Sequence, residues 1–264
     1  MTTAAQLFGA ATPFDPAHKL VTSPFFSPVV LASIRALIAF YTMVTLIVIL
    51  AYDEVKLKAG GENFAYFTYL TYAGICAYYW ASFVQTFSFI RSHYKRYPLQ
   101  RWGKTLQVLH LMLQTTVINF PIIVTIAFWA LIASPTSLST PVLQWRNISV
   151  HALNSTFCIF EVLFTNNPPP QWIYLPFMIL LIGLYTAYAY VMHATQGFYP
   201  YEFLDPSIYH GRVAIYVAGI VIGEVVIFVV VWGLMKLRER MWPVRKDERA
   251  MVEREMREHG RGAV

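Results

Sequence analysis

Long apolar segments, each of about twenty residues or more, are the feature that most constrains this chain, because a helix of that length crosses roughly 30 Å of hydrocarbon. Six such segments lie near residues 28–52, 64–90, 106–133, 150–166, 172–194 and 213–236. With 57% hydrophobic and 13% charged residues, the chain is not an ordinary soluble domain. The sequence predicts an all-α polytopic membrane protein whose six transmembrane helices form one bundle, the fourth being the least apolar.

Basic residues are concentrated on one side of this predicted bundle. Five lie in the link 91–104 and five more between residues 236 and 246, whereas the links after segments one, three and five contain fewer. By the positive-inside rule, both termini and the 91–104 link are predicted to be cytoplasmic. Orientation and contact with membrane lipids account for this charge, so no nucleic-acid partner is expected. We expect a multi-pass protein of the endoplasmic reticulum or another endomembrane, and the sequence leaves the oligomeric state open.

The regions that flank the transmembrane domain 28–236 differ from it in composition. Residues 1–27 are rich in Pro, Thr and Ala and lack the pattern of a cleaved signal peptide. We expect them to form a poorly ordered cytoplasmic arm, or one lying on the membrane surface. Arg35, near the cytoplasmic end of the first segment, is expected to reach the lipid headgroups. Residues 237–264 are predicted to be a charged cytoplasmic tail, as a solvated or interfacial helix.

The fourth segment carries a polar stripe that calls for an explanation. Polar or thiol side chains follow one another at offsets of three, four, three and four residues, which places them on one helix face: His151, Asn154, Cys158, Glu161 and Thr165. A histidine and a carboxylate inside a membrane are costly, so the stripe suggests a functional site. Cys158, like Cys76, is expected to be a buried thiol, and two cysteines at this spacing support neither a disulfide framework nor a metal site. No cofactor is expected.

A second stripe with the same spacing begins the second segment, at Thr68, Thr71, Ile75, Tyr78, Ser82 and Gln85. We expect it to face the bundle interior, where its hydroxyls either serve a site or bond to their own and neighbouring helices. The predicted topology places Thr68, His151 and His193 within one or two turns of the same, non-cytoplasmic membrane face, and Glu161 about 15 Å deeper. A hydroxyl facing an imidazole is the minimum arrangement for nucleophilic acyl transfer. This reasoning alone does not separate Thr68 from Thr71.

Three motifs, taken in their order along the chain, resemble one family. They are G-G…Y-F-T-Y-L at the second segment, N-x-x-x-H followed ten residues later by Glu in the fourth, and H-x-T-x-G-x-Y-P-Y-x-F-L ending the fifth. The chain is similar over essentially residues 28–236 to the androgen-induced-protein-like family of six-span membrane proteins, and looks like a fungal-type member. The resemblance implies hydrolysis of fatty acid esters of hydroxy fatty acids by a threonine and a histidine.

Carried over by motif, these two residues are Thr68 in F-T-Y-L and His151 in N-I-S-V-H. Thr71 is a rival, because the spacing from Gly-Gly to Thr68 is one residue longer here than in the family. His151 is expected to accept the proton of Thr68, whose oxygen attacks the ester of a branched lipid.

Four further residues are assigned supporting roles: His193, Asn154, Tyr78 and Glu161. The first three are candidates to orient His151 or to donate to the oxyanion. Glu161 either polarises the stripe or pairs with a neighbouring helix.

Two other classes of protein compete with the hydrolase. Histidines near the two membrane faces suggest a six-span haem b redox protein, with His151 and His193 on one side and His93 and His110 on the other. Alternatively, the stripes only hold helices together in a non-catalytic lipid-binding or scaffold protein.

Overall fold

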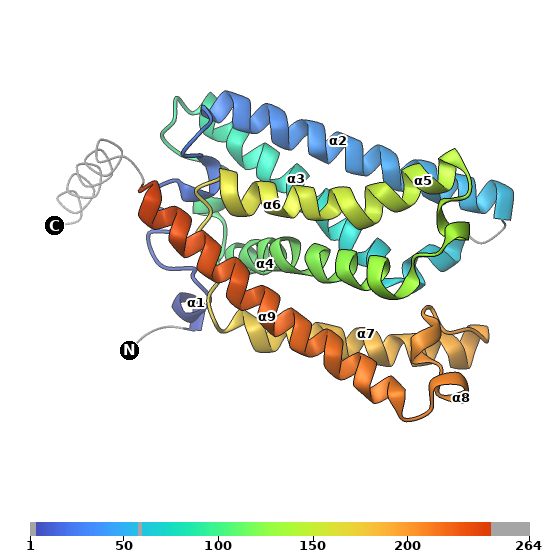
Figure 1. Ribbon diagram of the computed structural model, residues 1–264. Helices are drawn as coiled ribbons and strands as arrows, with labels where there is room; N and C mark the ends of the chain where they lie inside the picture. Colours follow the sequence, from blue (N-terminus) through green and yellow to red (C-terminus); the bar gives the residue numbers. More distant parts are fainter. Residues whose placement is uncertain (1–3, 58–59, 244–264) are drawn as a thin grey trace.

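The computed structural model describes residues 4–57 and 60–243, and these residues form an all-helical bundle with no strand among them (Figure 1). Its long helices are α2 (Pro28–Tyr52), α3 (Phe67–Arg91), α4 (Lys104–Ala127), α6 (Asn154–Phe164), α7 (Tyr174–Gln196) and α9 (Arg212–Met241). Shorter helices are α1 (Ala4–Leu7), α5 (Pro141–Ile148) and α8 (Pro206–Tyr209). Short 3₁₀ turns cover Lys19–Val21, Gly60–Ala65, Pro98–Arg101, Pro135–Leu138 and Glu202–Leu204.

Among the described residues, three π-helical turns lie at the end of the bundle remote from α1 (Figure 1). They cover Asp53–Leu57 after α2, Phe128–Ile132 after α4, and Ser149–Leu153 between α5 and α6. The last of these makes α5 and α6 one continuous helix. The fourth segment therefore begins at Pro141, where Thr140 caps the helix, and not near residue 150 as predicted.

Within the described residues, five helical stretches are long and apolar enough to cross a membrane. They are Pro28–Lys56, Lys104–Ile132, Pro141–Phe164, Tyr174–Gln196 and Arg212–Met241. Helix α3, the predicted second span, has 25 residues but is not among the five, because its polar stripe lowers its hydropathy. The least apolar of the six predicted segments is therefore α3, and not the fourth segment as predicted. The structure confirms an all-α protein with helices that could span a membrane, while six spans and cytoplasmic termini stay predictions.

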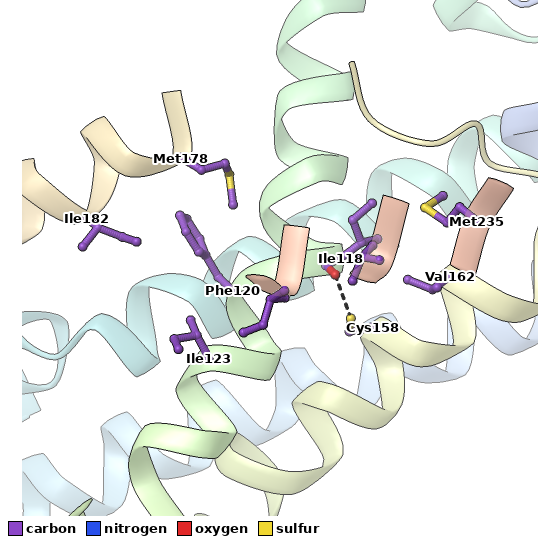
Figure 2. Close-up of a cluster of buried hydrophobic side chains, with 10 residues drawn as sticks. Ile118, Phe120, Ile123, Cys158, Val162, Met178, Ile182 and Met235 are labelled. Carbon is purple, nitrogen blue, oxygen red and sulfur yellow. Dashed lines mark hydrogen bonds between the residues drawn. The ribbon is translucent and has the colours of Figure 1, made fainter. Parts of the chain in front are cut away.

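The polar stripe of α3 faces the bundle interior, as predicted. Thr68, Tyr78, Ser82 and Gln85 are buried, whereas Thr71 is only partly buried. Helices α4, α6, α7 and α9 share an apolar core (Figure 2). Within this core the thiol of Cys158 lies 3.1 Å from the carbonyl oxygen of Ile118, so it behaves as a buried free thiol.

The N-terminal arm is an integral part of the bundle, so the prediction of a poorly ordered arm is wrong. Four of its side chains are buried against the end of α3 and the following link: Ala10, Phe14, Leu20 and Val21. The carboxylate of Asp15 accepts hydrogen bonds from the backbone N–H groups of Lys19 and Leu20 and from the phenol of Tyr97, at 2.9, 3.0 and 2.6 Å. The low charge of the arm reflects these apolar anchors rather than disorder.

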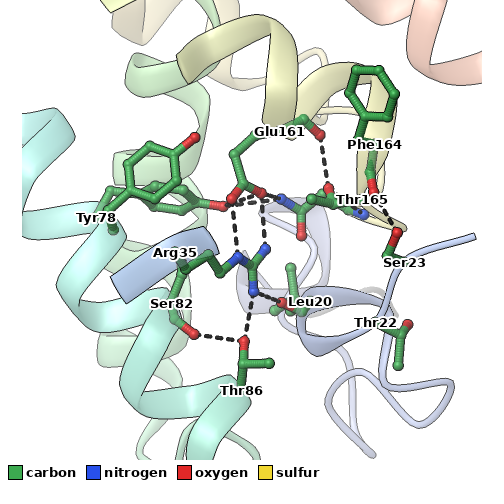
Figure 3. Close-up of polar contacts among 12 residues, drawn as sticks. Leu20, Thr22, Ser23, Arg35, Tyr78, Ser82, Thr86, Glu161, Phe164 and Thr165 are labelled. Atoms are coloured by element: carbon green, nitrogen blue, oxygen red, sulfur yellow. Dashed lines mark hydrogen bonds and ion pairs between the residues drawn. The ribbon is translucent and has the colours of Figure 1, made fainter. Parts of the chain in front are cut away.

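The prediction that Arg35 reaches the headgroups is wrong, because its side chain is 0% exposed. Figure 3 shows this side chain pointing at Glu161 and Thr86. Its guanidinium binds both carboxylate oxygens of Glu161, at 3.0 and 2.8 Å, and donates to the Leu20 carbonyl and the Thr86 hydroxyl at 2.8 Å. Tyr78 also donates to Glu161, at 3.1 Å. A charge this deeply buried requires such a partner, and the sequence position of Arg35 near a helix end concealed it.

The C-terminal boundary also differs from the prediction. Helix α9 continues to Met241, five residues beyond the predicted end of the transmembrane domain. The predicted tail helix falls largely on residues 244–264, which lie outside the described residues.

Candidate active site

In the described part of the chain, two cavities that share wall residues lie at the end of the bundle where α3 begins. An inner cavity of about 60 Å³ is almost wholly apolar, with walls from α4, α7 and α9. An outer cavity of about 380 Å³ is more polar and includes Arg146 and Glu202 in its wall. The residues common to both cavities are Thr68, Phe128, Ile132, His151, Tyr201 and Phe203. The structure therefore brings Thr68 and His151 together where a narrow apolar space meets a wider polar one.

Thr68 is placed by the start of α3. Tyr66 precedes the helix in an extended conformation, so the N–H of Thr68 belongs to the first turn and has no acceptor within the helix. That N–H lies 3.4 Å from the phenol oxygen of Tyr201, and the Thr68 hydroxyl is also 3.4 Å from it. The nucleophile candidate thus lies at the positive end of a 25-residue helix.

Thr71, the rival, has different surroundings. Its hydroxyl donates to the Thr68 carbonyl at 2.9 Å, the back-bonding typical of a helical threonine. It lines a separate apolar groove between α3, α4 and α7, and it is absent from the walls of both cavities that contain His151. The geometry associates Thr68, not Thr71, with the imidazole.

His151 is held by an aromatic stack between two π-helical turns. Its ring lies parallel to that of Phe128, with centroids 3.7 Å apart, and Phe128 begins the π-helical turn after α4. The indole N–H of Trp129 donates to the His151 carbonyl at 3.1 Å. Wide turns of this kind place side chains that a regular helix cannot, and they recur at functional sites. The run S-V-H-A-L contains no Gly or Pro that could have predicted the turn.

The buried Nδ1 atom of His151 has no hydrogen-bond partner among the described residues. No carboxylate orients the ring through this nitrogen, so the site offers a Thr–His pair and not a triad. The contact made by the face of the ring is its stack on Phe128.

The four supporting candidates lie elsewhere. His193 is exposed and stacks on Tyr199, with centroids 4.0 Å apart. Asn154 is buried between α4 and α6, where its side-chain oxygen accepts from Thr125 at 3.0 Å. Tyr78 and Glu161 belong to the Arg35 cluster of Figure 3. None of the four lines either cavity. For Glu161, pairing with a neighbouring helix is what the structure shows.

Arg146 ties the outer cavity wall to three other elements. It donates to the Tyr69 phenol, the Asp53 carboxylate and the Asn63 amide oxygen, at 2.6, 2.8 and 3.2 Å. These bonds join α5 to α3, to the end of α2 and to the link between them. The wall of the outer cavity is therefore held by a charged cluster, whereas the inner cavity depends on apolar packing.

Sequence reasoning missed Tyr201, which it assigned no role beyond its place in the motif that ends the fifth segment. The residue lies in the loop between α7 and α9, and its ring stacks on Phe203 with centroids 5.3 Å apart. Burial raises the pKa of the Tyr201 phenol, so the group is protonated at neutral pH. Its place in the motif H-x-T-x-G-x-Y-P-Y was the available signal.

The four histidines of the haem hypothesis do not share a cavity, whereas Thr68 and His151 do. His151 lines the two cavities and His193 does not; His110 packs on Tyr78, and His93 is exposed. Within residues 4–57 and 60–243, no three His, Cys, Asp or Glu side chains form a group that could hold a metal ion.

Together, these features define an α-helical membrane protein with a threonine and a histidine at a mainly apolar cavity. The family model described as FAR-17a/AIG1-like protein matches residues 34–236. The chain belongs to this family, the androgen-induced protein family, as the resemblance predicted. Comparisons with curated proteins and with solved structures gave no match.

Proposed function

We propose that this chain is an intramembrane hydrolase of lipid carboxylic esters, with Thr68 as nucleophile and His151 as base. Its proposed substrates are fatty acid esters of hydroxy fatty acids. Its proposed location is an endomembrane such as that of the endoplasmic reticulum. The observation that carries the proposal is that Thr68 and His151 line the same two cavities, although they are 83 positions apart in the chain. Family membership supports hydrolase chemistry for this pair.

The walls of the two cavities support a lipid substrate. The inner cavity is lined by aliphatic and aromatic side chains, including Ile123, Ile182 and Val217, and suits the acyl chain. The outer cavity, with its phenols and charges, suits the alcohol part and the entering water. An ester between the two chains would then lie beside Thr68.

In the first step, the imidazole of His151 accepts the hydroxyl proton of Thr68 as the oxygen attacks the ester carbonyl. A bond forms between that oxygen and the carbonyl carbon, and an electron pair moves onto the carbonyl oxygen. When this pair returns, the bond to the alcohol oxygen breaks, and His151 gives its proton to the leaving hydroxy fatty acid.

In the second step, water replaces the alcohol. His151 accepts a proton from water as the water oxygen attacks the acyl-threonine, and the tetrahedral intermediate collapses. The bond to Thr68 breaks, the threonine oxygen regains a proton from His151, and the fatty acid leaves.

The test compares Thr68→Ala and His151→Ala with wild-type protein in lipid nanodiscs, by measuring hydroxy fatty acid release. Each change is expected to reduce kcat/KM by at least about 10²-fold, since each removes the nucleophile or its base. Thr71→Ala and His193→Ala are matched controls, because they delete the same side chains outside the two cavities. Both controls are expected to retain hydrolysis.

Full hydrolysis by folded Thr68→Ala or His151→Ala contradicts the proposal. Labelling of wild-type protein by a fluorophosphonate probe, lost in Thr68→Ala, separates a hydrolase from a lipid-binding or scaffold protein. A visible haem absorption band in the purified protein would favour the redox hypothesis instead.

A further inference from the structure

Tyr201 is the side chain that contacts both the hydroxyl and the N–H of Thr68. The two contacts are each 3.4 Å long and involve the same phenol oxygen. They come from a loop remote in the chain from α3, whereas the hydroxyl of Thr71, one turn away, bonds only to its own helix. A contact of this kind to the nucleophile calls for a role in the reaction.

The direction of these hydrogen bonds follows from the donors available. The backbone N–H of Thr68 can only donate, so the Tyr201 oxygen accepts from it. The phenol proton can then be donated toward the Thr68 hydroxyl and the cavity beside it. The oxygen of Tyr185, whose own proton goes to the Ala65 carbonyl, is the other acceptor within reach of this phenol. A phenol that accepts from an N–H at the positive end of a helix is polarised, which makes its own O–H a stronger donor.

The packing of Tyr201 fixes where this donor points. Its ring stacks on Phe203 at an interplanar angle of 7°, and meets the edge of Tyr66 with centroids 5.7 Å apart. Tyr201 and Phe203 are both in the walls of the inner and outer cavities. The donor is therefore held at the junction where the ester is proposed to lie.

We propose that Tyr201 is a catalytic residue whose phenol donates a hydrogen bond to the oxyanion formed when Thr68 attacks the ester carbonyl. This inference rests on the proposed function. In the tetrahedral intermediate, the oxyanion and the Thr68 oxygen are bonded to the same carbon, so a donor within reach of one lies beside the other. Tyr201 keeps its proton throughout; it stabilises the negative charge by a hydrogen bond and does not act as an acid.

The test is Tyr201→Phe, which removes the hydroxyl and retains the ring that packs on Phe203. The expected result is a loss in kcat of about 10²–10³-fold, the range for loss of one oxyanion donor, with KM changed by less than about twofold. A lipid trifluoromethyl ketone, which forms a tetrahedral adduct with the nucleophile, should bind more weakly by a similar factor. Tyr199→Phe, the same change in the same loop but outside both cavities, is the matched control.

The outcomes separate this inference from the proposed function. If Thr68→Ala is inactive and Tyr201→Phe retains wild-type kcat, Tyr201 is not an oxyanion donor and the hydrolase stands. A raised KM with unchanged kcat also overturns the inference, because it indicates a role in binding alone. Should Tyr201→Phe fold poorly, Tyr201→His retains a donor and should recover part of the rate; activity equal to that of Tyr201→Ala contradicts the assignment. Undiminished hydrolysis by Thr68→Ala refutes the proposed function itself.

Discussion

The imidazole of His151 lies flat against the ring of Phe128, with centroids 3.7 Å apart and planes only 4° from parallel. Both residues come from π-helical turns, one after α4 and one between α5 and α6. Because Nδ1 has no partner among the described residues, this stack is the contact that fixes the ring plane. An aromatic stack thus replaces the usual carboxylate as the orienting group of the proposed base.

Phe128→Leu is expected to lower kcat by about tenfold, since an aromatic pair contributes up to about 1.5 kcal/mol beyond its buried area. Phe128→Tyr, which retains the stacked ring, should keep most of the activity. Steady-state hydrolysis of the lipid ester by both purified variants measures the difference. Equal kcat values for the Leu and Tyr variants would show that the stack does not orient His151.

The ion pair between Arg35 and Glu161 should determine stability and not catalysis. Both side chains are 0% exposed, so Glu161→Ala leaves an unpaired buried guanidinium at a cost of about 3–5 kcal/mol. The double variant Arg35→Met/Glu161→Leu should recover much of that stability, because no isolated charge remains. Thermal unfolding in detergent tests both expectations. Equal melting temperatures of Glu161→Ala and wild-type protein would contradict the expected loss of stability.

The helices were predictable from the sequence because the periods of apolar and polar residues were unambiguous. Helix α2 has the predicted bounds, and the stripes on α3 and α6 face inward as expected. Hydropathy alone leaves α3 out of the candidate spans, because its polar side chains lower the mean, although the stripe lies inside the bundle.

The details of the candidate site depend on contacts distant in the chain, which single-sequence reasoning does not reach. Arg35 resembled an interfacial arginine because its partner, Glu161, lies 126 positions away. Tyr201 was assigned no role because its contact with Thr68 spans 133 positions. The π-helical turn at His151 has no local signal, since the run S-V-H-A-L contains no Gly or Pro.

The N-terminal arm should loosen at alkaline pH. Burial, with the Asp15 carboxylate beside it, raises the pKa of the Tyr97 phenol well above its ordinary value. The folded state therefore favours the protonated phenol. Its contribution to stability is fully present below about pH 10, the unfolded pKa, and is lost as pH rises toward the folded pKa.

Tyr97→Phe removes this titration together with the hydrogen bond to Asp15. The melting temperature of wild-type protein is expected to fall more steeply between about pH 9 and pH 11 than that of Tyr97→Phe. Parallel curves for the two proteins over this range would contradict the prediction.

The inner cavity should set the length of acyl chain that the enzyme accepts. Ala127 lines this cavity of about 60 Å³, so Ala127→Phe is expected to fill much of it. Hydrolysis of long-chain esters should fall by at least about tenfold, since the displaced chain loses several buried methylene contacts, while a short-chain ester is cleaved nearly as before. Ala130→Phe is the matched control, because Ala130 lies three residues further on, in the π-helical turn after α4, and is exposed and absent from the cavity wall. Comparing kcat/KM across an acyl-length series in both variants is the measurement. An unchanged length preference in Ala127→Phe would mean that the acyl chain lies elsewhere, for example in the groove between α3, α4 and α7.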